Sequence, residues 1–347
     1  MFKQFGGKIT PELKNRYAQS PNWKDGKFEN LVETGMDFSL KDLPGMLYKL
    51  FFQKGNTTPN RDLPIMPIDL EAFLAPSDSI KYIWYGHGVF LLRVNGKTLL
   101  IDPMFGPDAA PISPFGSKRF TKNTLEIIDT LPNIDLMLLT HDHYDHLDLA
   151  SMKKLIPKIK SYYVALGSAR HLEAWGVNPT LITEFDWWDS ANFAEIDITF
   201  TPSRHFSGRG LNDRAKSLWG GWVFKTATES LYLTGDGGYG PHFKVIGERL
   251  GPFDYGLIEC GQYGEKWHQI HMFPEESITA ALDSKIKQGM PYHWAGFKLA
   301  LHDWTEPADE FVNYAAEKGF EYTLPKLGAI NTLKDPRITQ KWWSNFL

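Results

Sequence analysis

Short apolar runs separated by turn residues dominate the chain from residue 80 onward, and they predict β-strands. The runs at 89–94 and 97–102 are joined by Asn95-Gly96, the pair most favourable to a type I′ turn, so we expect a hairpin there. Further strands are expected at 80–85, 134–139, 162–165, 196–200, 219–225, 231–234 and 255–258.

Segments with helical spacing lie between these strands, at 147–155, 168–175, 243–250, 274–287 and 307–318. Hairpins mixed with strand-helix-strand units predict an α/β fold in which sheets pack together and helices lie outside.

The first 78 residues are rich in Pro, Gly, Asn and Lys, and we expect residues 1–78 to form an N-terminal extension packed on a single domain, 79–347. One apolar segment in the extension, 43–52, either packs onto the core or faces lipid.

Composition narrows the classes of function. The 347 residues carry a net charge of −4, which gives no reason to expect nucleic acid as a partner. A single cysteine, Cys260, excludes a disulfide framework and a thiolate zinc finger, so any metal must be held by His and carboxylates. We see no signal peptide and no apolar run long enough to span a bilayer, so we expect a cytoplasmic or membrane-peripheral protein.

A cluster of polar residues follows the strand at 134–139, in the order His141-Asp142-His143-Tyr144-Asp145-His146-Leu147-Asp148. So many polar groups at the end of a buried strand need partners, and metal ions supply them. In an extended segment alternate side chains share a side, so His141 and His143 point the same way. The turn into the next helix brings Asp145 and His146 to a second position close by. Two metal ions about 3.5–4 Å apart would suit this split cluster.

One such element cannot complete two coordination spheres, so distant donors are expected at other strand ends. His205 follows the strand at 196–200, Asp236 follows 231–234, and His293 follows the apolar residues 290–292. Each alone is typical of an ordinary structural residue; together and in this order they favour a shared metal centre.

This ordered set resembles the metallo-β-lactamase superfamily. Within it, the chain is similar to the branch that contains N-acylphosphatidylethanolamine-hydrolysing phospholipase D, across roughly residues 80–305. The resemblance rests on WYGHGVFLL (84–92), IDPMFG (101–106), GSKRF (116–120), DWWD (186–189), LWGGW (218–222), GDGGYGPHFKVIGERLGPFD (235–254), HMFPEE (271–276) and HWAGF (293–297). It implies an αββα sandwich with the site at strand ends along one edge.

The resemblance also implies which residues hold each ion. One metal would be bound by His141, His143 and His205, the other by Asp145, His146 and His293, and Asp236 would bridge them. This ligand chemistry makes Zn²⁺ the first expectation, with iron and manganese as alternatives. Two divalent ions lower the pKa of a shared water, and the resulting hydroxide is the expected nucleophile.

Two further histidines are candidates for the pocket. In the branch that the chain resembles, the position of His271 contacts the substrate phosphate, and His302 could hold a ligand or leaving oxygen. A structural hydrogen bond is the alternative for each. The mammalian phospholipase pattern has Gln at the position of Ile270, next to His271. Because the chain departs from that pattern here, the same preference for a lipid headgroup does not follow from the resemblance.

Four nearby residues are expected to support the site. Asp102 is predicted to accept an N–H from a ligand histidine, or to stabilise a turn, and Asp148 is predicted to orient a ligand histidine. His87 is expected to be a buried hydrogen-bonding residue. Tyr144 either packs beside the site or touches substrate.

The leading hypothesis is a two-metal phosphodiesterase of phospholipase D type that acts on an N-acyl phospholipid or related lipid. Peripheral contact with a membrane and assembly into a homo-oligomer are both compatible with the sequence. The alternative on the same site is a lactonase or carboxylic-ester hydrolase. Remote alternatives are a non-catalytic metal-binding protein and an NAD-dependent oxidoreductase. The last is suggested by the GxGxxG pattern at 235–240 with Glu259 about 20 residues on.

Overall fold

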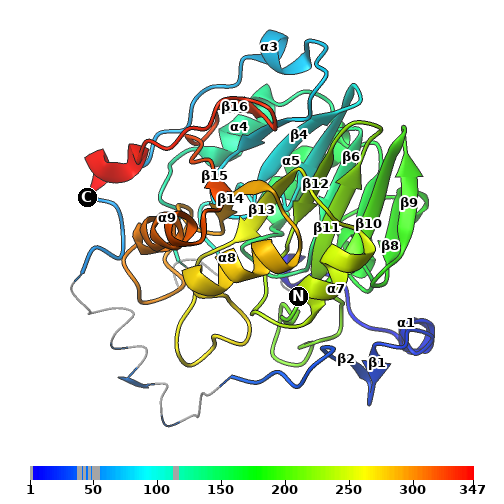
Figure 1. Ribbon diagram of the computed structural model, residues 1–347. Helices are drawn as coiled ribbons and strands as arrows, with labels where there is room; N and C mark the ends of the chain where they lie inside the picture. The colour runs from blue at the N-terminus through cyan, green and yellow to red at the C-terminus, as the bar shows by residue number, and fades with distance from the viewer. Residues whose placement is uncertain (1–2, 37–40, 42–43, 46–47, 49–54, 112–116) are drawn as a thin grey trace.

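Two large β-sheets pack face to face in the computed structural model, which describes residues 3–36, 41, 44–45, 48, 55–111 and 117–347. Each sheet has seven strands within that part of the chain. Figure 1 shows the two sheets side by side with helices on the outside.

The first sheet has the order β16-β3-β4-β5-β6-β7-β8. Its strands from β16 to β5 are antiparallel, and those from β5 to β8 are parallel. The bounds are β3 Lys81–Trp84, β4 Phe90–Val94, β5 Lys97–Ile101, β6 Leu136–Leu139, β7 Tyr162–Ala165, β8 Ile182–Phe185 and β16 Ile330–Thr332.

The second sheet repeats this arrangement in the order β15-β14-β13-β12-β11-β10-β9. Strands β9 to β12 are antiparallel and β12 to β15 are parallel. The bounds are β9 Ser190–Phe193, β10 Ile196–Pro202, β11 Gly220–Lys225, β12 Ser230–Leu233, β13 Tyr255–Glu259, β14 Gln288–Tyr292 and β15 Glu321–Tyr322.

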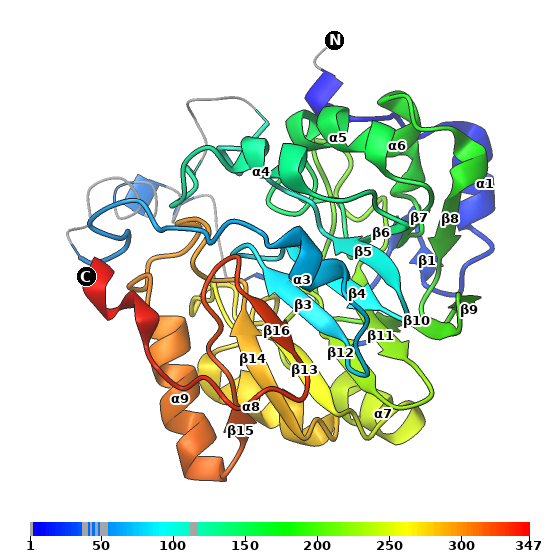
Figure 2. The same cartoon turned by 90° about the horizontal axis from the view of Figure 1, so that it is seen from above.

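Three apolar layers hold the sandwich together. The largest lies between the sheets, where the Tyr82 and Tyr255 hydroxyls of opposite sheets are 2.8 Å apart. The second layer joins the outer face of the first sheet to helices α4 Thr124–Thr130, α5 Leu149–Leu155 and α6 Ala169–Ala174. The third joins the second sheet to α7 His242–Arg249, α8 Pro274–Asp283 and α9 Glu306–Lys318. Figure 2 shows these two groups of helices on opposite sides, so the predicted αββα sandwich is confirmed.

The elements agree closely with the predicted strands and helices, with some exceptions. The hairpin β4–β5 turns through Asn95 and Gly96, whose φ angles of 48° and 69° are those a type I′ turn requires. The helix predicted at 274–287 is four residues too long, because α8 ends at Asp283 and the chain must straighten to enter β14 at Gln288. Helix α4 and strands β8, β9, β15 and β16 were not predicted. Neither β8 nor β9 has a strongly apolar run.

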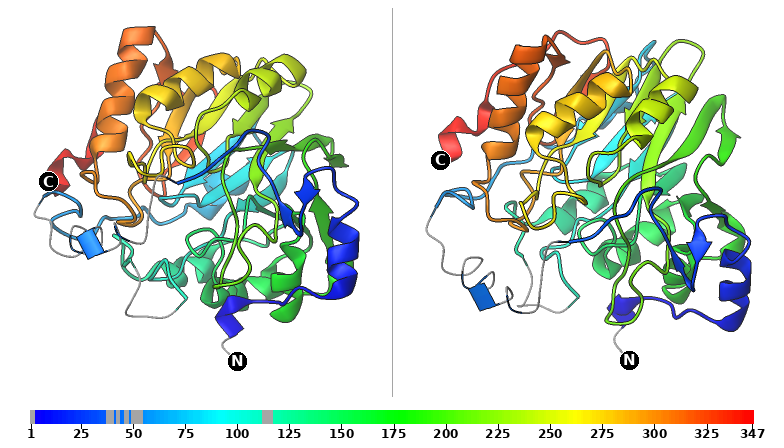
Figure 3. Two further views of the ribbon diagram at one scale, coloured as in Figure 1. Left: turned by 90° about the horizontal axis from the view of Figure 1, so that it is seen from below. Right: turned by 60° about the horizontal axis from the view of Figure 1, so that its bottom comes forward.

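The N-terminal residues lie against the sandwich. They contain η1 Lys3–Phe5, α1 Pro11–Tyr17, the two-stranded β1 Trp23–Lys24 and β2 Lys27–Phe28, and α3 Leu70–Leu74. Figure 3 shows the first of these segments, in blue, passing across the loops at one edge of the sandwich. The boundary at residue 78 stays a prediction, and the apolar segment at 43–52 lies largely outside the described residues. Among those described, no helix is long and apolar enough to cross a membrane.

Candidate metal centre

Four strand ends meet at one edge of the sandwich and bring the predicted ligands together. The loop after β6 carries the sequence 141–146 from the first sheet. The loops after β10, β12 and β14 of the second sheet carry His205, Asp236 and His293. Parallel neighbours end at the same edge of a sheet, which is why residues far apart in sequence converge here.

Three imidazoles form the first group of converging donors. His141 Nε2 lies 2.9 Å from His143 Nδ1, which lies 3.2 Å from His205 Nε2. His141 and His205 are buried and His143 is partly exposed. Three ring nitrogens directed at one point are an arrangement that a metal ion stabilises, since neutral imidazoles cannot all donate to one another.

The second group contains Asp145, His146 and His293. The Nε2 atoms of His146 and His293 are 3.3 Å apart, and Asp145 Oδ2 is 3.5 Å from each of them. His87 joins the group from the side, with its Nε2 2.7 Å from Asp145 Oδ2. Within the described residues, these four offer ligand atoms within 4.8 Å of one another.

Asp236 lies between the two groups. Its Oδ2 is 2.9 Å from His293 Nε2, 3.0 Å from His146 Nε2 and 4.0 Å from His141 Nε2. Its Oδ1 is buried and has no hydrogen-bond partner. A buried carboxylate oxygen without a partner is costly, so Asp236 is well suited to bridge two cations. The division of ligands between two ions stays a prediction.

The outer nitrogens of three ligand histidines are already engaged, which leaves their inner nitrogens free for a metal. His146 Nδ1 lies 2.8 Å from Asp102 Oδ2, and His205 Nδ1 lies 3.0 Å from the Ile270 carbonyl. His141 Nδ1 lies 3.0 Å from the Thr140 hydroxyl, which itself donates to Asp102. These contacts select the tautomer whose lone pair faces the centre, as in metal proteins generally. The donor set therefore fits divalent metal ions.

The electrostatics differ between the two groups. Burial, followed by the nearby His146 and His143, holds the pKa of His141 well below its usual value, and burial lowers the pKa of His143 to about 4. Burial also opposes charge on His146, but Asp236 and the other carboxylates around it raise its pKa well above the usual value. The carboxylates therefore gather on the His146 side, while the first group is a neutral imidazole cluster.

Asp102 is placed as predicted, and Asp148 is not. Asp102 accepts from a ligand histidine and from the Thr140 amide. Asp148 accepts instead from the amides of Ser151 and Gly106, so it caps α5 and holds the neighbouring loop, and the expectation that it orients a histidine is wrong. His87 is a buried hydrogen-bonding residue, as expected.

A buried polar network holds the loop of residues 140–148. Arg209 donates to the carbonyls of Asp142 and Leu147, which flank the ligands, and to the carbonyl of Gln4. Its guanidinium lies 4.0 Å from the ring centroid of Tyr144, whose hydroxyl donates to the Arg209 carbonyl. Tyr144 therefore packs beside the site. Sequence reasoning missed Arg209, because nothing near it in the chain indicates which carbonyls it reaches.

A second missed contact fastens the N-terminal segment to a ligand. Residues 28–35, here called the strap, cross the loop after β10. The Asn30 side chain accepts from the His205 amide at 3.1 Å and donates to the His205 carbonyl at 2.8 Å. It also accepts from Trp219 Nε1 at 3.0 Å. This pairing fixes the backbone that presents His205.

The two pocket histidines have different surroundings. His271 lies beside the centre, where its ring stacks on His293 with centroids 5.2 Å apart. Its side chain is 13% exposed, so it is reachable from outside. His302 Nε2 accepts from the Gln262 amide and its Nδ1 lies 2.8 Å from the Asp303 carbonyl. With both nitrogens engaged, His302 favours the structural alternative.

The glycine-rich loop after β12 does not have the features of a dinucleotide site. Asp236 within it belongs to the metal centre, and Glu259 is fully buried against histidines, where no ribose could reach it. A Cβ at Gly235 would lie 2.2 Å from the Gly220 carbonyl, and one at Gly238 would lie 2.2 Å from the Gln269 carbonyl. The glycines thus permit close packing of the backbone. Because neither Asp236 nor Glu259 is placed to bind a dinucleotide, the NAD-dependent oxidoreductase alternative is wrong.

Comparison with known proteins agrees with this geometry. The beta-lactamase superfamily domain matches residues 97–294. An uncharacterised protein of Mycobacterium tuberculosis is 34% identical over 94% of this chain and 88% of its own length. An N-acyl-phosphatidylethanolamine-hydrolyzing phospholipase D of Caenorhabditis elegans is 30% identical over 72% of this chain and 73% of its own length.

A solved structure shares the fold. It is Igni18, a metallo hydrolase from Ignicoccus hospitalis, with a TM-score of 0.57 at 20% identity over 74% of this chain and all of that chain. The domain match, the sandwich and the His/Asp cluster at its edge agree with one another. The chain belongs to the metallo-β-lactamase superfamily and is a metal-dependent hydrolase.

Proposed function

We propose that the protein is a phosphodiesterase of phospholipase D type, which hydrolyses an N-acyl phospholipid or a related lipid. The relative from Caenorhabditis elegans supports this choice of bond and substrate class. The structural observation that carries it is an apolar cavity lined in part by Phe273 and His302, residues close in the fold to the ligand-side residues His271 and His293.

The cavity has a volume of about 520 Å³, and its lining is mainly apolar and aromatic. The lining residues are Lys41, Gly45, Tyr263, Gly264, Glu265, Lys266, Trp267, Phe273, Leu301 and His302. Its lining residue His302 is linked to the ligand His293 by hydrogen bonds: the Gln262 amide donates to His302 Nε2, and the Gln262 side chain donates to the His293 carbonyl. A volume of this size accommodates part of an acyl chain but is larger than a small polar substrate needs.

The residues of the chain have distinct roles in the proposed reaction. Two divalent ions, zinc first and iron or manganese as alternatives, would supply the activated water and neutralise the phosphate. The ligand histidines are held with their lone pairs inward by Asp102, Thr140 and the Ile270 carbonyl. The partly exposed side chains of His143, Asp145 and His271 mark the side from which a phosphodiester enters. A lipid substrate also implies that this side meets a lipid surface.

The test compares two bond classes with one preparation. Zinc-loaded protein is assayed on N-acyl phosphatidylethanolamine in mixed micelles and on a panel of lactones, with products identified by mass spectrometry. We expect release of the N-acylethanolamine and phosphatidic acid, and loss of at least about 10³-fold in Asp145→Asn, which lacks a charged ligand. Turnover of lactones without cleavage of any phosphodiester would contradict the proposal and favour the ester-hydrolase alternative.

A further inference from the structure

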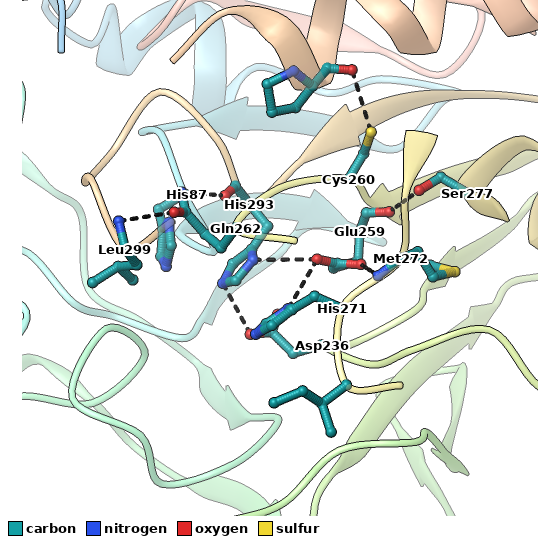
Figure 4. Close-up of polar contacts among 12 residues, drawn as sticks. His87, Asp236, Glu259, Cys260, Gln262, His271, Met272, Ser277, His293 and Leu299 are labelled. Atoms are coloured by element: carbon teal, nitrogen blue, oxygen red, sulfur yellow. Dashed lines mark hydrogen bonds and ion pairs between the residues drawn. The ribbon is translucent and has the colours of Figure 1, made fainter. Parts of the chain in front are cut away.

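Glu259, the last residue of β13, places a carboxylate between two histidines of the site (Figure 4). Its side chain is fully buried. Its Oε1 lies 3.1 Å from His271 Nδ1 and 3.4 Å from His293 Nδ1. The two histidines come from different loops, so one carboxylate connects separate parts of the centre.

The position of this carboxylate is fixed by its own contacts. Oε2 accepts from the Met272 amide at 3.1 Å. The Glu259 amide donates to the Thr234 hydroxyl at 2.9 Å, and its carbonyl accepts from the Ser277 hydroxyl at 2.7 Å. A side chain held at both oxygens and at its backbone cannot move far without breaking several hydrogen bonds. Glu259 is therefore a rigid reference point for whatever binds to it.

For His293, the contact determines which nitrogen faces the metal centre. His293 Nδ1 is buried without a hydrogen-bond partner and faces Glu259 Oε1 at the ion-pair distance of 3.4 Å. A proton on this Nδ1 leaves the lone pair on Nε2, which lies 2.9 Å from Asp236 Oδ2. A carboxylate behind a ligand imidazole also raises the basicity of that ligand. Glu259 thus faces His293 from the side on which Asp102 faces His146, at 3.4 Å compared with 2.8 Å.

For His271, the same oxygen fixes the ring beside the centre. Its Nδ1–H donates to Glu259, so the lone pair is on Nε2, on the opposite side of the ring. His271 offers a ring nitrogen within 4.8 Å of ligand atoms of both His205 and Asp236. The ring planes of His271 and His293 are inclined by 17°, as expected for two rings aligned on one acceptor.

We propose that Glu259 is a positioning residue shared by the metal ligand His293 and the substrate-side residue His271. One buried carboxylate sets the tautomer and orientation of both rings, and so links metal binding at the His293 position to the placement of His271. The part that concerns His271 rests on the proposed function, whereas the part that concerns His293 requires only that the centre binds metal.

The first experiment measures metal binding without any substrate. Zinc is titrated into metal-free protein in competition with a chromophoric chelator, for wild type, Glu259→Gln and Glu259→Asp. We expect the weaker-bound of the two zinc ions to lose 10- to 100-fold in affinity in both variants. An amide with its oxygen toward the rings turns its NH₂ toward the Met272 N–H and so cannot keep the position of the carboxylate, and the shorter Asp carboxylate cannot reach both rings.

Glu229→Gln is the matched control. Glu229 is another buried glutamate, and it accepts from the Ile80 amide and the Ser79 hydroxyl, remote from the centre. This variant reports the general cost of neutralising a buried glutamate, and its zinc affinity should equal that of wild type. Equal zinc affinity in Glu259→Gln, Glu259→Asp and this control would overturn the proposal.

The second experiment tests the link to His271 through hydrolysis of bis(p-nitrophenyl) phosphate at saturating zinc. If Glu259 acts through His271, then Glu259→Gln and His271→Ala should each lower kcat, and the double variant should be no slower than the slower single variant. Additive losses would show that Glu259 does not act through His271. If wild type hydrolyses no phosphodiester while the zinc result holds, the proposed function fails and the role of Glu259 at His293 stands.

Discussion

The two halves of the metal centre are assembled in different ways. The half carried by the first sheet comes from one loop, residues 140–148, and its ligands are neighbours in sequence. The half carried by the second sheet comes from three loops, and its ligands His205, Asp236 and His293 are separated by at least thirty residues. A few hydrogen bonds to one loop position all the ligands of a local motif, whereas ligands from three loops need contacts that position each loop separately.

The supporting contacts reflect this difference. The motif loop is held from behind by Asp102 and Arg209. In the scattered half, Asn30 from the N-terminal strap fixes His205, and Glu259 faces His293. Both halves therefore rely on residues distant in sequence, and the scattered half also uses Asn30, which lies outside the region that the superfamily domain matches.

The largest effect should follow from removing Asp236, the carboxylate that lies between the two groups of metal ligands. Asp236→Ala takes a buried carboxylate from between His146 and His293, so we expect loss of metal from both groups and about a 10³-fold or greater fall in hydrolysis. Metal content by mass spectrometry after gel filtration checks this. Asp197→Ala, on the exposed face of β10, is the control. Retention of two ions by Asp236→Ala would show that the two groups of ligands bind metal independently of this carboxylate.

The next effect concerns the support of the motif loop at low pH. Burial, followed by the charge of Arg170, lowers the pKa of His171 to about 3, and its Nε2 lies 3.1 Å from Asp142 Oδ2. The unfolded chain takes up this proton below about pH 6.5 while the folded one does not, so stability falls as pH falls. Between pH 7 and pH 4 this one group contributes a loss of about 3 kcal/mol.

His171→Gln removes the titrating ring, so its free energy of unfolding should depend less on pH, by about 3 kcal/mol over that range. Urea denaturation of both proteins at pH 7 and pH 4 measures the difference. An unchanged pH dependence would mean that His171 is not buried in its neutral form.

The smallest effect tests the strap. Asn30→Ala removes the paired hydrogen bonds to the His205 backbone, and we expect about a 10-fold loss of zinc affinity at one ion, since supporting residues of metal ligands have effects of this size. Asn22→Ala is the matched control. It removes a hydrogen bond that the Asn22 side chain, in the same N-terminal segment, donates to Asp186, which is not a metal ligand. If both variants bind zinc equally well, the strap does not contribute to the scattered half.

The sequence by itself determined the sandwich and most of its elements. Apolar runs and the Asn95-Gly96 turn indicate strands because side-chain burial and backbone preference act locally. Residues 141–146 indicate a metal site because so many His and Asp side chains cannot be buried together without a cation, and this signal is also local. His205, Asp236 and His293 were found because each follows an apolar run, and the structure brings all three to that cluster.

Only the tertiary structure decided which residues support those ligands. The sequence pattern placed Glu259 at a ribose, but the structure places it against His271 and His293, and Asp148 caps a helix. Asn30 lies 175 residues from His205, and nothing in its neighbourhood predicts that contact. A supporting residue needs only one or two hydrogen bonds of the right direction, which many polar residues can supply. Its identity therefore depends on how the sheets pack and the loops cross, and no local pattern in the chain records that.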